Sequence, residues 1–421
     1  MNVPLTRSVS SKRRPIIKSL SLGLNEALRL TLEGVKPLPA EQVALVDSVG
    51  RTAASELFAL VDSPSTDASL KDGYAVISRE VAHATAQDPV RLRLLGAMAA
   101  GAERKDILIK PGTTVRVLTG ARIPSGADAV VPEEGVRREE GDVMIETSAE
   151  PGANILPRGT DVSFRTCILR SGRHISPGMA GLLAAAGHSK IPVFRNPVVG
   201  IIGTGDEIVQ PGEPLTEGKL YASNIMTLAG WCNRYRMKSL MTIVRDDHDA
   251  IFRALERLSG ETDAVITSGG AWTGDRDMLA RVLAGLGWKE VFHRIRIGPG
   301  KAVGFGTLDE KPVFILPGGP PSNLMGFLQI ALPGLLALSG HESPGLPRIN
   351  ARLASQLKGR DQDWTDFFFG TLELDDGMPT FHPLIDPSRL RSIAEATAVA
   401  SIPEGQDCLL EGSIIPVQLL E

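Results

Sequence analysis

The feature that most constrains the fold of this 421-residue chain is a regular alternation of strand-like and helix-like segments across residues 197–340. Each strand-like run is short and apolar, and a helical pattern follows it. Strands that alternate with helices in this way are joined by right-handed crossovers, which place the strands parallel in one sheet with helices on both faces. The expected strands are 198–202, 239–244, 264–266 and 313–316, and the expected helices are 224–237, 248–258, 275–286 and 322–338.

The segments outside this region predict further domains, so that the whole chain is expected to be a multidomain α/β protein. Short strands split by Gly and Pro turns indicate a β module before the doubly wound sheet and a small β-barrel or sandwich after it. Helical and mixed patterns flank the β module on both sides. The expected boundaries are a flexible tail at 1–20, a discontinuous helical and mixed domain at 21–60 and 148–196, an inserted β module at 61–147, the doubly wound domain at 197–340 and a β-barrel at 345–421.

Composition excludes several classes of partner. Lys and Arg number 45 and Asp and Glu 49, a net charge of −4, and aromatic residues make up 5% of the chain, so neither a basic surface nor a stacking platform for nucleic acid is expected. The apolar runs are shorter than the ~20 residues of a membrane span. Cys167, Cys232 and Cys408 are too far apart for a zinc knuckle and too few for a disulfide framework, which predicts a cytoplasmic protein without a membrane partner.

Glycine-rich loops follow three of the expected parallel strands, at 203–207, 267–270 and 317–322. Ligands of open α/β sheets bind beyond the carboxyl ends of the strands, where these loops are expected to meet. Glycine lets backbone N–H groups approach an anion closely, and a helix N-terminus favours negative charge. Phosphate binding is therefore one interpretation, and tight turns between strand and helix are the other.

Acidic residues lie within or beside the same loops. Carboxylates next to phosphate-binding loops are typical of a Mg²⁺ site, because Mg²⁺ prefers a few carboxylates together with substrate oxygens and water. The alternative is that each acid caps the helix that follows it, a role that Asp fills readily and that we consider equally for Asp275. The acids in question are Asp206, Glu207, Asp246, Asp247, Asp275 and Asp277.

A lysine, Lys301, lies in a loop between two strand-like stretches. A fixed ammonium there would bind a phosphate or an oxyanion, and a solvated surface lysine is the alternative. Dinucleotide binding is not expected, since Gly203 and Gly205 are followed by Ile208 where the third glycine of that fingerprint belongs. The sequence contains no P-loop and no paired Ser/His or Cys/His arrangement, so covalent catalysis is not expected either.

A set of short motifs runs from residue 24 to the C-terminus. They are Asp72-Gly-Tyr-Ala-Val76, Thr119-Gly-Ala121, Ser125-Gly-Ala-Asp-Ala-Val-Val131, Thr204-Gly-Asp-Glu207 with Tyr221 and Asn224, Arg245-Asp-Asp247, Ser268-Gly-Gly270, Gly274-Asp275-x-Asp277, Pro299-Gly-Lys301 and Leu316-Pro-Gly318. In order and spacing the chain resembles the molybdopterin molybdenumtransferases. The combination is far more specific than any single motif.

The resemblance implies a function and an assembly. Members of this family insert molybdenum from molybdate into adenylylated molybdopterin, with Mg²⁺-dependent release of AMP, in molybdenum cofactor biosynthesis. The resemblance also implies an elongated homodimer, in which the doubly wound domain of one copy faces the β module of the other. The molybdopterin adenylyltransferase and recipient molybdoenzymes are further expected partners.

By the same resemblance, site residues are assigned to positions of this sequence. The catalytic set would be Asp206, Glu207, Asp247, Asp277 and Lys301, and Glu207, Asp247 and Asp277 would hold the metal ion. The molybdopterin-binding set would be Thr204, Gly205, Ser268, Gly269, Gly270, Trp272, Gly274, Asp275, Pro317, Gly318 and Ser322, with Asp72, Thr119 and Asp161 contributed across the dimer.

The chain departs from the family pattern at positions expected to line the pocket. Ala271-Trp272-Thr273 stands in place of Val-Ser-Val, Gly298 in place of a lysine, and Gly319 in place of an asparagine. Trp272 would either stack on a flat ring or pack against the next helix, and Arg294 and Arg296 are candidates to replace the lysine.

These changes leave two functions open, an active transferase and a non-catalytic paralogue that carries molybdopterin or the finished cofactor. The retained acids favour the enzyme, because a carrier does not need a metal site.

Overall fold

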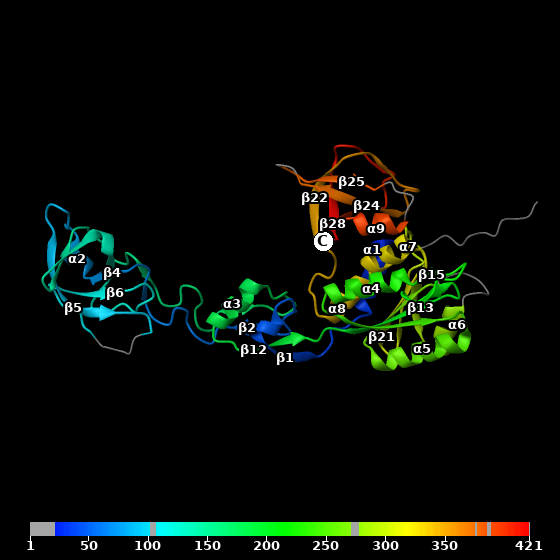
Figure 1. Cartoon of the computed structure of the whole chain (residues 1–421), viewed down its shortest axis with the longest axis horizontal. Coiled ribbons are helices and arrows are strands. Elements are labelled where there is room, and N and C mark those ends of the chain that lie inside the picture. Colours follow the sequence, from blue (N-terminus) through cyan, green and yellow to red (C-terminus); the bar gives the residue numbers. More distant parts are fainter. Residues whose placement is uncertain (1–21, 102–106, 271–277, 375–376, 385–388, 421) are drawn as a thin grey trace, which may run out of the picture. The chain divides into compact units, whose positions relative to one another are not determined.

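The computed structural model divides the chain into two compact units, residues 1–38 with 195–421, and residues 39–194 (Figure 1). The structure describes residues 22–101, 107–270, 278–374, 377–384 and 389–420. The expected tail at 1–20 lies outside the described residues. The domain boundaries proposed from the sequence remain a prediction.

A six-stranded sheet forms the centre of the first unit, and it confirms the doubly wound α/β prediction. The strands, in spatial order, are β16 (Lys238–Val244), β13 (Val198–Thr204), β17 (Ala264–Ser268), β21 (Lys311–Leu316), β20 (Gly304–Leu308) and β18 (Lys289–His293). The first four are parallel, and β20 and β18 add an antiparallel edge. From β13 the chain crosses to β16 on one side and later to β17 on the other, so the strand order reverses at β13.

Helices cover both faces of this sheet because consecutive strand residues are apolar. Ile201 packs on one face with residues of α4, whereas Ile202 packs on the other with residues of α5 and α6. Figure 1 shows α4 and α5 on opposite sides of the sheet. The helices are α4 (Ser223–Arg234), α5 (His248–Glu261), α6 (Met278–Gly285), α7 (Pro320–Gly326) and α8 (Leu332–Leu338), with a π-helical segment, Phe327–Ala331, between the last two.

The helical run Pro320–Leu338 is, within the described residues, the one segment long and apolar enough to cross a membrane by length and composition. It is a core helix instead, since 83% of its most apolar window is buried. The first helix, α1 (Leu24–Glu33), contacts α8 and the π-helical segment. These contacts place α1 in the first unit.

The expected β-barrel follows the sheet domain and is closed. Its strands are β22 (Arg348–Leu353), β24 (Thr365–Glu373), β25 (Thr380–Pro383), β26 (Ala398–Ile402) and β28 (Ile414–Leu419), and pairing of β24 with β26 completes the ring. Phe381, Ile402 and Val417 are buried in its core. A short strand, β19 (Ile297–Gly298), pairs with β24, and helix α9 (Arg389–Glu395) packs against α7.

The second unit contains the expected β module. Its six-stranded sheet consists, in spatial order, of β7 (Ala129–Pro132), β4 (Gly73–Val76), β6 (Thr113–Val117), β5 (Val90–Met98), β9 (Asp142–Ile145) and β8 (Val136–Glu139). Short antiparallel pairs and helix α3 (Pro177–Ala185) form the rest. Pro177 begins α3, and the Ser176 side chain caps it by accepting from the Met179 N–H.

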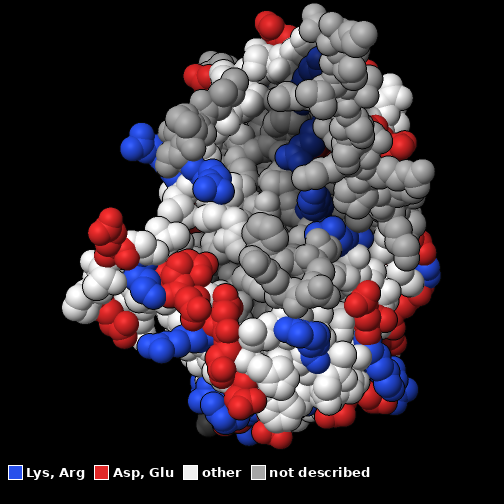
Figure 2. Space-filling view, turned by 90° about the vertical axis from the view of Figure 1, so that its right-hand side faces the viewer, with Lys and Arg blue, Asp and Glu red and all other residues white. Residues whose placement is uncertain are grey.

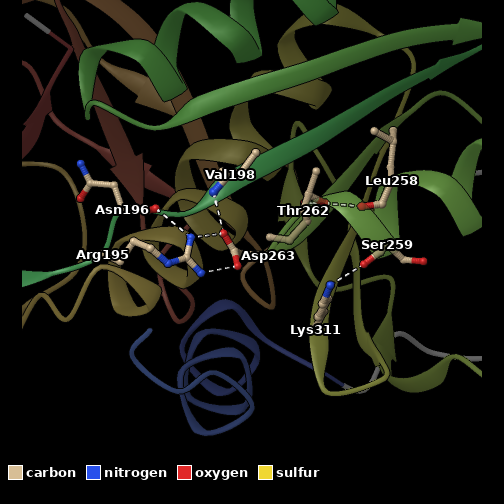
Figure 3. A network of polar contacts seen from close by, with 9 residues as sticks. Arg195, Asn196, Val198, Leu258, Ser259, Thr262, Asp263 and Lys311 are labelled. Atoms are coloured by element: carbon tan, nitrogen blue, oxygen red, sulfur yellow. Dashed lines mark hydrogen bonds and ion pairs between the residues drawn. The ribbon is translucent and has the colours of Figure 1, made fainter. Parts of the chain in front are cut away.

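A polar cluster anchors the entry into the doubly wound sheet (Figure 3). Asp263, just before β17, accepts two hydrogen bonds from the Arg195 guanidinium, at 2.6 and 2.7 Å, and one from the Val198 N–H at 2.8 Å. Partial burial raises the pKa of the Asp263 carboxyl, but the bonds from Arg195 and Val198 outweigh it and hold the pKa below its usual value. The charge of Asp263 thus ties the starts of β13 and β17 together.

Replacing Asp263 by Ala is expected to lower the free energy of unfolding of this unit by about 1–3 kcal/mol, because the Arg195 guanidinium and the Val198 N–H lose their acceptor. Urea unfolding followed by tryptophan fluorescence measures this unit, since all four tryptophans lie within 195–421. Asp249→Ala, whose side chain is 75% exposed, is the matched control and should change little. Equal stability of the two variants would contradict the role of Asp263.

The same carboxylate makes stability depend on pH. Because its pKa is lower in the folded chain, its contribution is complete above the unfolded pKa, near 4, and is lost as the pH falls through the folded value. Between about pH 5 and pH 3, the wild type should therefore lose more stability than Asp263→Asn. Urea midpoints measured across this range test the difference, and parallel losses in both proteins would exclude it.

Candidate functional site

A cavity of about 660 Å³ lies at the carboxyl ends of the parallel strands, next to the point where the strand order reverses. This is where open α/β sheets bind ligands. Figure 2 faces this end of the unit and shows Asp and Glu side chains gathered on one part of it, with Lys and Arg side chains around them. The described lining residues are Gly203, Thr204, Glu207, Ile208, Leu215, Leu220, Tyr221, Ala222, Ser223, Asn224, Ile225, Ser268, Gly269, Gly318, Pro320, Arg389 and Leu390.

The wall of the cavity depends on the close approach of two strand ends. Gly269 has φ +102°, and a Cβ there would lie 2.5 Å from the carbonyl oxygen of Thr204. Only glycine fits this position, so the loop leaves its backbone open to a ligand. The Thr204 hydroxyl beside it is buried without a hydrogen-bond partner in the described part of the chain, and it is available to a bound group.

Two amide side chains hold Ser268 at the end of β17. Asn323 donates to Ser268 Oγ at 3.0 Å and to the Pro317 carbonyl at 2.9 Å. Asn224 donates to Ser268 Oγ at 3.3 Å and to the Gly318 carbonyl at 2.8 Å. Since the hydroxyl oxygen accepts from both amides, its proton is left to donate toward a ligand. These bonds connect the loops after β17 and β21 with α4.

Three carboxylates are brought close together at one side of the cavity. Partial burial, followed by the negative charges of Asp206 and Glu207, raises the pKa of Asp246. The Asp246 N–H donates to Asp206 Oδ1 at 3.4 Å, and Glu207 lines the cavity. Asp247 caps α5, because its Oδ1 accepts from the Ala250 N–H at 2.8 Å. For Asp247 the helix-capping interpretation therefore describes the structure.

Asp206, Glu207 and Asp246 offer the type of ligand that a hard divalent cation prefers, but not a complete set. Carboxylate oxygens are the ligands that Mg²⁺ prefers. A positive ion would also relieve the repulsion by Asp206 and Glu207, which adds to burial in raising the pKa of Asp246. Within the described residues, however, no three His, Cys, Asp or Glu side chains are arranged so that they could hold a metal ion. Asp277, the third predicted ligand, lies outside those residues.

The other predicted residues fall into separate places. Thr204, Glu207, Ser268, Gly269 and Gly318 line the cavity, whereas Lys301 is exposed and is absent from its described lining. Asp206, Asp247, Gly205, Gly270, Pro317 and Ser322 belong to the neighbouring loops and helix starts without lining it. Trp272, Gly274, Asp275 and Asp277 lie outside the described residues.

The expected replacement for the missing lysine is not seen at Arg296. Its guanidinium donates to the Asp363 carbonyl at 2.8 Å and pairs with Glu404 at 3.2 Å. Arg294 has φ +72° and lies between β18 and β19, outside either strand. A lysine at 298 would not fit either, because a Cβ on Gly298 would lie 2.3 Å from Asp366 Oδ1.

The three residues expected to act across a dimer lie in the second unit. Asp72 accepts from the Thr119 N–H at 2.6 Å and from the Thr119 hydroxyl at 2.8 Å. These two bonds, the backbone one first, lower the pKa of the Asp72 carboxyl. Asp161 lines a separate cavity of about 340 Å³ together with the exposed Cys167.

Sequence reasoning missed several residues of the site, among them Asn323 and Arg389. Asn323 is 1% exposed near the start of an apolar helical run, and a polar residue in such a run is the signal that could have identified it. Arg389 lines the cavity from α9, and nothing in the local sequence indicates this.

Comparisons with known proteins agree with this architecture. Residues 22–187 match the family described as "MoeA N-terminal region (domain I and II)", and residues 200–337 match "Probable molybdopterin binding domain". The chain is 32% identical to molybdopterin molybdenumtransferase 2 of Mycobacterium tuberculosis over 90% of this chain and 95% of that protein. It is 30% identical to the Bacillus subtilis molybdopterin molybdenumtransferase, over 96% and 95%.

A solved structure extends the agreement to the whole fold. The crystal structure of the molybdopterin biosynthesis MoeA protein from Pyrococcus horikoshii superposes with a TM-score of 0.81 at 28% identity, covering 94% of this chain and 99% of that one. The chain belongs to the molybdopterin molybdenumtransferase family.

Proposed function

We propose that this chain transfers molybdenum from molybdate to adenylylated molybdopterin, with release of AMP, in molybdenum cofactor biosynthesis. The observation that carries the proposal is the cavity where the strand order reverses, which has glycine backbone and hydroxyl donors on one wall and carboxylates on another. Family membership supplies the substrate class.

In the proposed complex, the donors of the cavity hold the substrate. The open backbone at Gly269 and the proton of Ser268 face the bound group, and the buried Thr204 hydroxyl gains a partner. The exposed apolar side chains of Leu215 and Leu220 also line the cavity, where they offer apolar surface to the flat ring of a pterin.

Mg²⁺, held by Glu207, Asp247 and Asp277, would supply positive charge against the phosphoanhydride oxygens as they become more negative. Asp206 and Asp246 add negative charge beside Glu207, which strengthens the binding of a cation there. The capping bond fixes the Asp247 carboxylate through Oδ1 and leaves its second oxygen for the ion. No side chain has to act as a nucleophile, because the reaction requires positioning and charge stabilisation.

The assembly is part of the proposal. We place the chain in a cytoplasmic homodimer in which Asp72, Thr119 and Asp161 of a second copy complete the site. The molybdopterin adenylyltransferase would deliver the substrate and recipient molybdoenzymes would accept the product.

One observation favours a second function. The position of the family lysine, Gly298, is closed by Asp366, so a cation of the family pattern is missing. A non-catalytic carrier would bind adenylylated molybdopterin and release no AMP.

Purified protein incubated with adenylylated molybdopterin, molybdate and Mg²⁺ is expected to release AMP and form the cofactor. Glu207→Gln should slow AMP release by about 100-fold or more, since the cation loses a carboxylate at the reacting phosphates. Glu217→Gln, an exposed residue of the same segment, is the matched control and should turn over normally. Substrate binding without AMP release by the wild type would establish the carrier function instead.

Ser268→Ala is expected to raise the KM for adenylylated molybdopterin by about 10-fold, because the site loses its hydroxyl donor and one acceptor of the Asn323 amide. Steady-state AMP release with varied substrate separates this change from a change in kcat. Ser259→Ala, on α5 and away from the cavity, is the control. An unchanged KM in Ser268→Ala would remove Ser268 from the binding site.

A further inference from the structure

The start of helix α7 offers an anion fewer backbone donors than an ordinary helix start. Gly319 caps the helix, and its first two residues are Pro320 and Pro321. Proline has no N–H, so two of the donors that a helix N-terminus normally presents are missing here. Gly319 also lacks the amide side chain of the family pattern. An anion at this edge of the cavity needs another donor.

Arg389 lies where that donor is needed. It begins α9 of the barrel domain and lines the cavity together with Leu390. Its Nη1 atom is 3.9 Å from the position that a Cβ of Gly319 would occupy, so the guanidinium stands beside the glycine. Helix α9 packs against α7, which brings this arginine from a distant part of the sequence to the cavity.

The positive charge of Arg389 is not neutralised by an ion pair within the described chain, so it can bind an anionic ligand. It is the one Lys or Arg among the described residues that line the cavity, and no acidic side chain of the described chain pairs with it. Arg360 provides the contrast. Its guanidinium lies 3.0 Å from the Cβ position of Gly298, but it is paired with Asp366, whose side chain is 5% exposed. Arg360 is therefore committed within the fold, whereas Arg389 is not.

We propose that Arg389 binds a tetrahedral oxyanion of the substrates, a phosphate of the adenylylated pterin or molybdate itself. A guanidinium presents its N–H donors in a planar fork that matches such oxygens with two bonds at once. Arg389, from α9, would thus supply the hydrogen-bond donors that are missing at Gly319, which has no amide side chain, and at the two prolines that begin α7. This inference rests on the proposed function of the cavity.

Isothermal titration of the full chain with AMP, and separately with molybdate, tests the assignment. Arg389→Ala is expected to bind one of these probes about 10- to 100-fold more weakly than the wild type, since charge-assisted hydrogen bonds are lost. Arg389→Lys should recover part of the affinity, because it keeps the charge without the fork. Arg391→Ala is the matched control, since Arg391 is exposed on the same helix but is not among the described lining residues.

The two probes distinguish the source of the oxyanion. Weaker binding of AMP alone assigns Arg389 to a phosphate, and weaker binding of molybdate alone assigns it to the metal oxyanion. Unchanged affinity of Arg389→Ala for both probes overturns the inference, as does a wild type that binds neither. AMP release by the wild type tests the proposed function separately, so a failure of one is not read as a failure of the other.

Discussion

The approach of β13 to β17 at their carboxyl ends is the constraint on which the first unit depends. The chain crosses from β13 to β16 in one direction and reaches β17 on the other side, so the two loops that leave these neighbouring strands turn apart. A ligand cavity opens between them as a consequence of the connections. Pairing of β13 with β17 brings the loop after β17 so close to Thr204 that only glycine fits at position 269. Ser268 and its two amide partners join the remaining loops to this point.

Much of this fold could be predicted from the sequence because its burial pattern is local. Ile201 and Ile202 are neighbours and both apolar, because each faces a different layer of helices. Strands covered on both faces therefore appear in the sequence as short, continuous apolar runs between helices. The antiparallel pairing of β20 with β21 and of β18 with β20 could not be predicted. The polar and charged residues of Lys289–His293 do not indicate which strand β18 pairs with. Nor could the packing of α1 on α8 be predicted, since it depends on contacts between opposite parts of the chain.

Some residues of the site could likewise be predicted from the sequence, and others could not. The glycine loops and the acids could be predicted, since each follows from the chemistry of a few consecutive residues. The tripeptide Arg245-Asp246-Asp247 shows where local reasoning ends. Asp247 caps α5, whereas Asp246 lies near Asp206 and Glu207. Because the two residues are adjacent and of the same type, the sequence does not show which of them has which role. The role of Arg389 could not be predicted either, because only the packing of α9 on α7 places it at the cavity.

The closed space at Gly298 has a consequence for how this chain can change. A lysine at this position requires its neighbours to shift, because its Cβ would lie 2.3 Å from Asp366 Oδ1 and 3.0 Å from the Arg360 guanidinium carbon. Asp366 is buried, it accepts from the Arg360 N–H at 2.7 Å, and it lies opposite Gly298 in the β19–β24 pairing. A side chain at position 298 is therefore coupled to Asp366 and Arg360, which would have to move to make room for it.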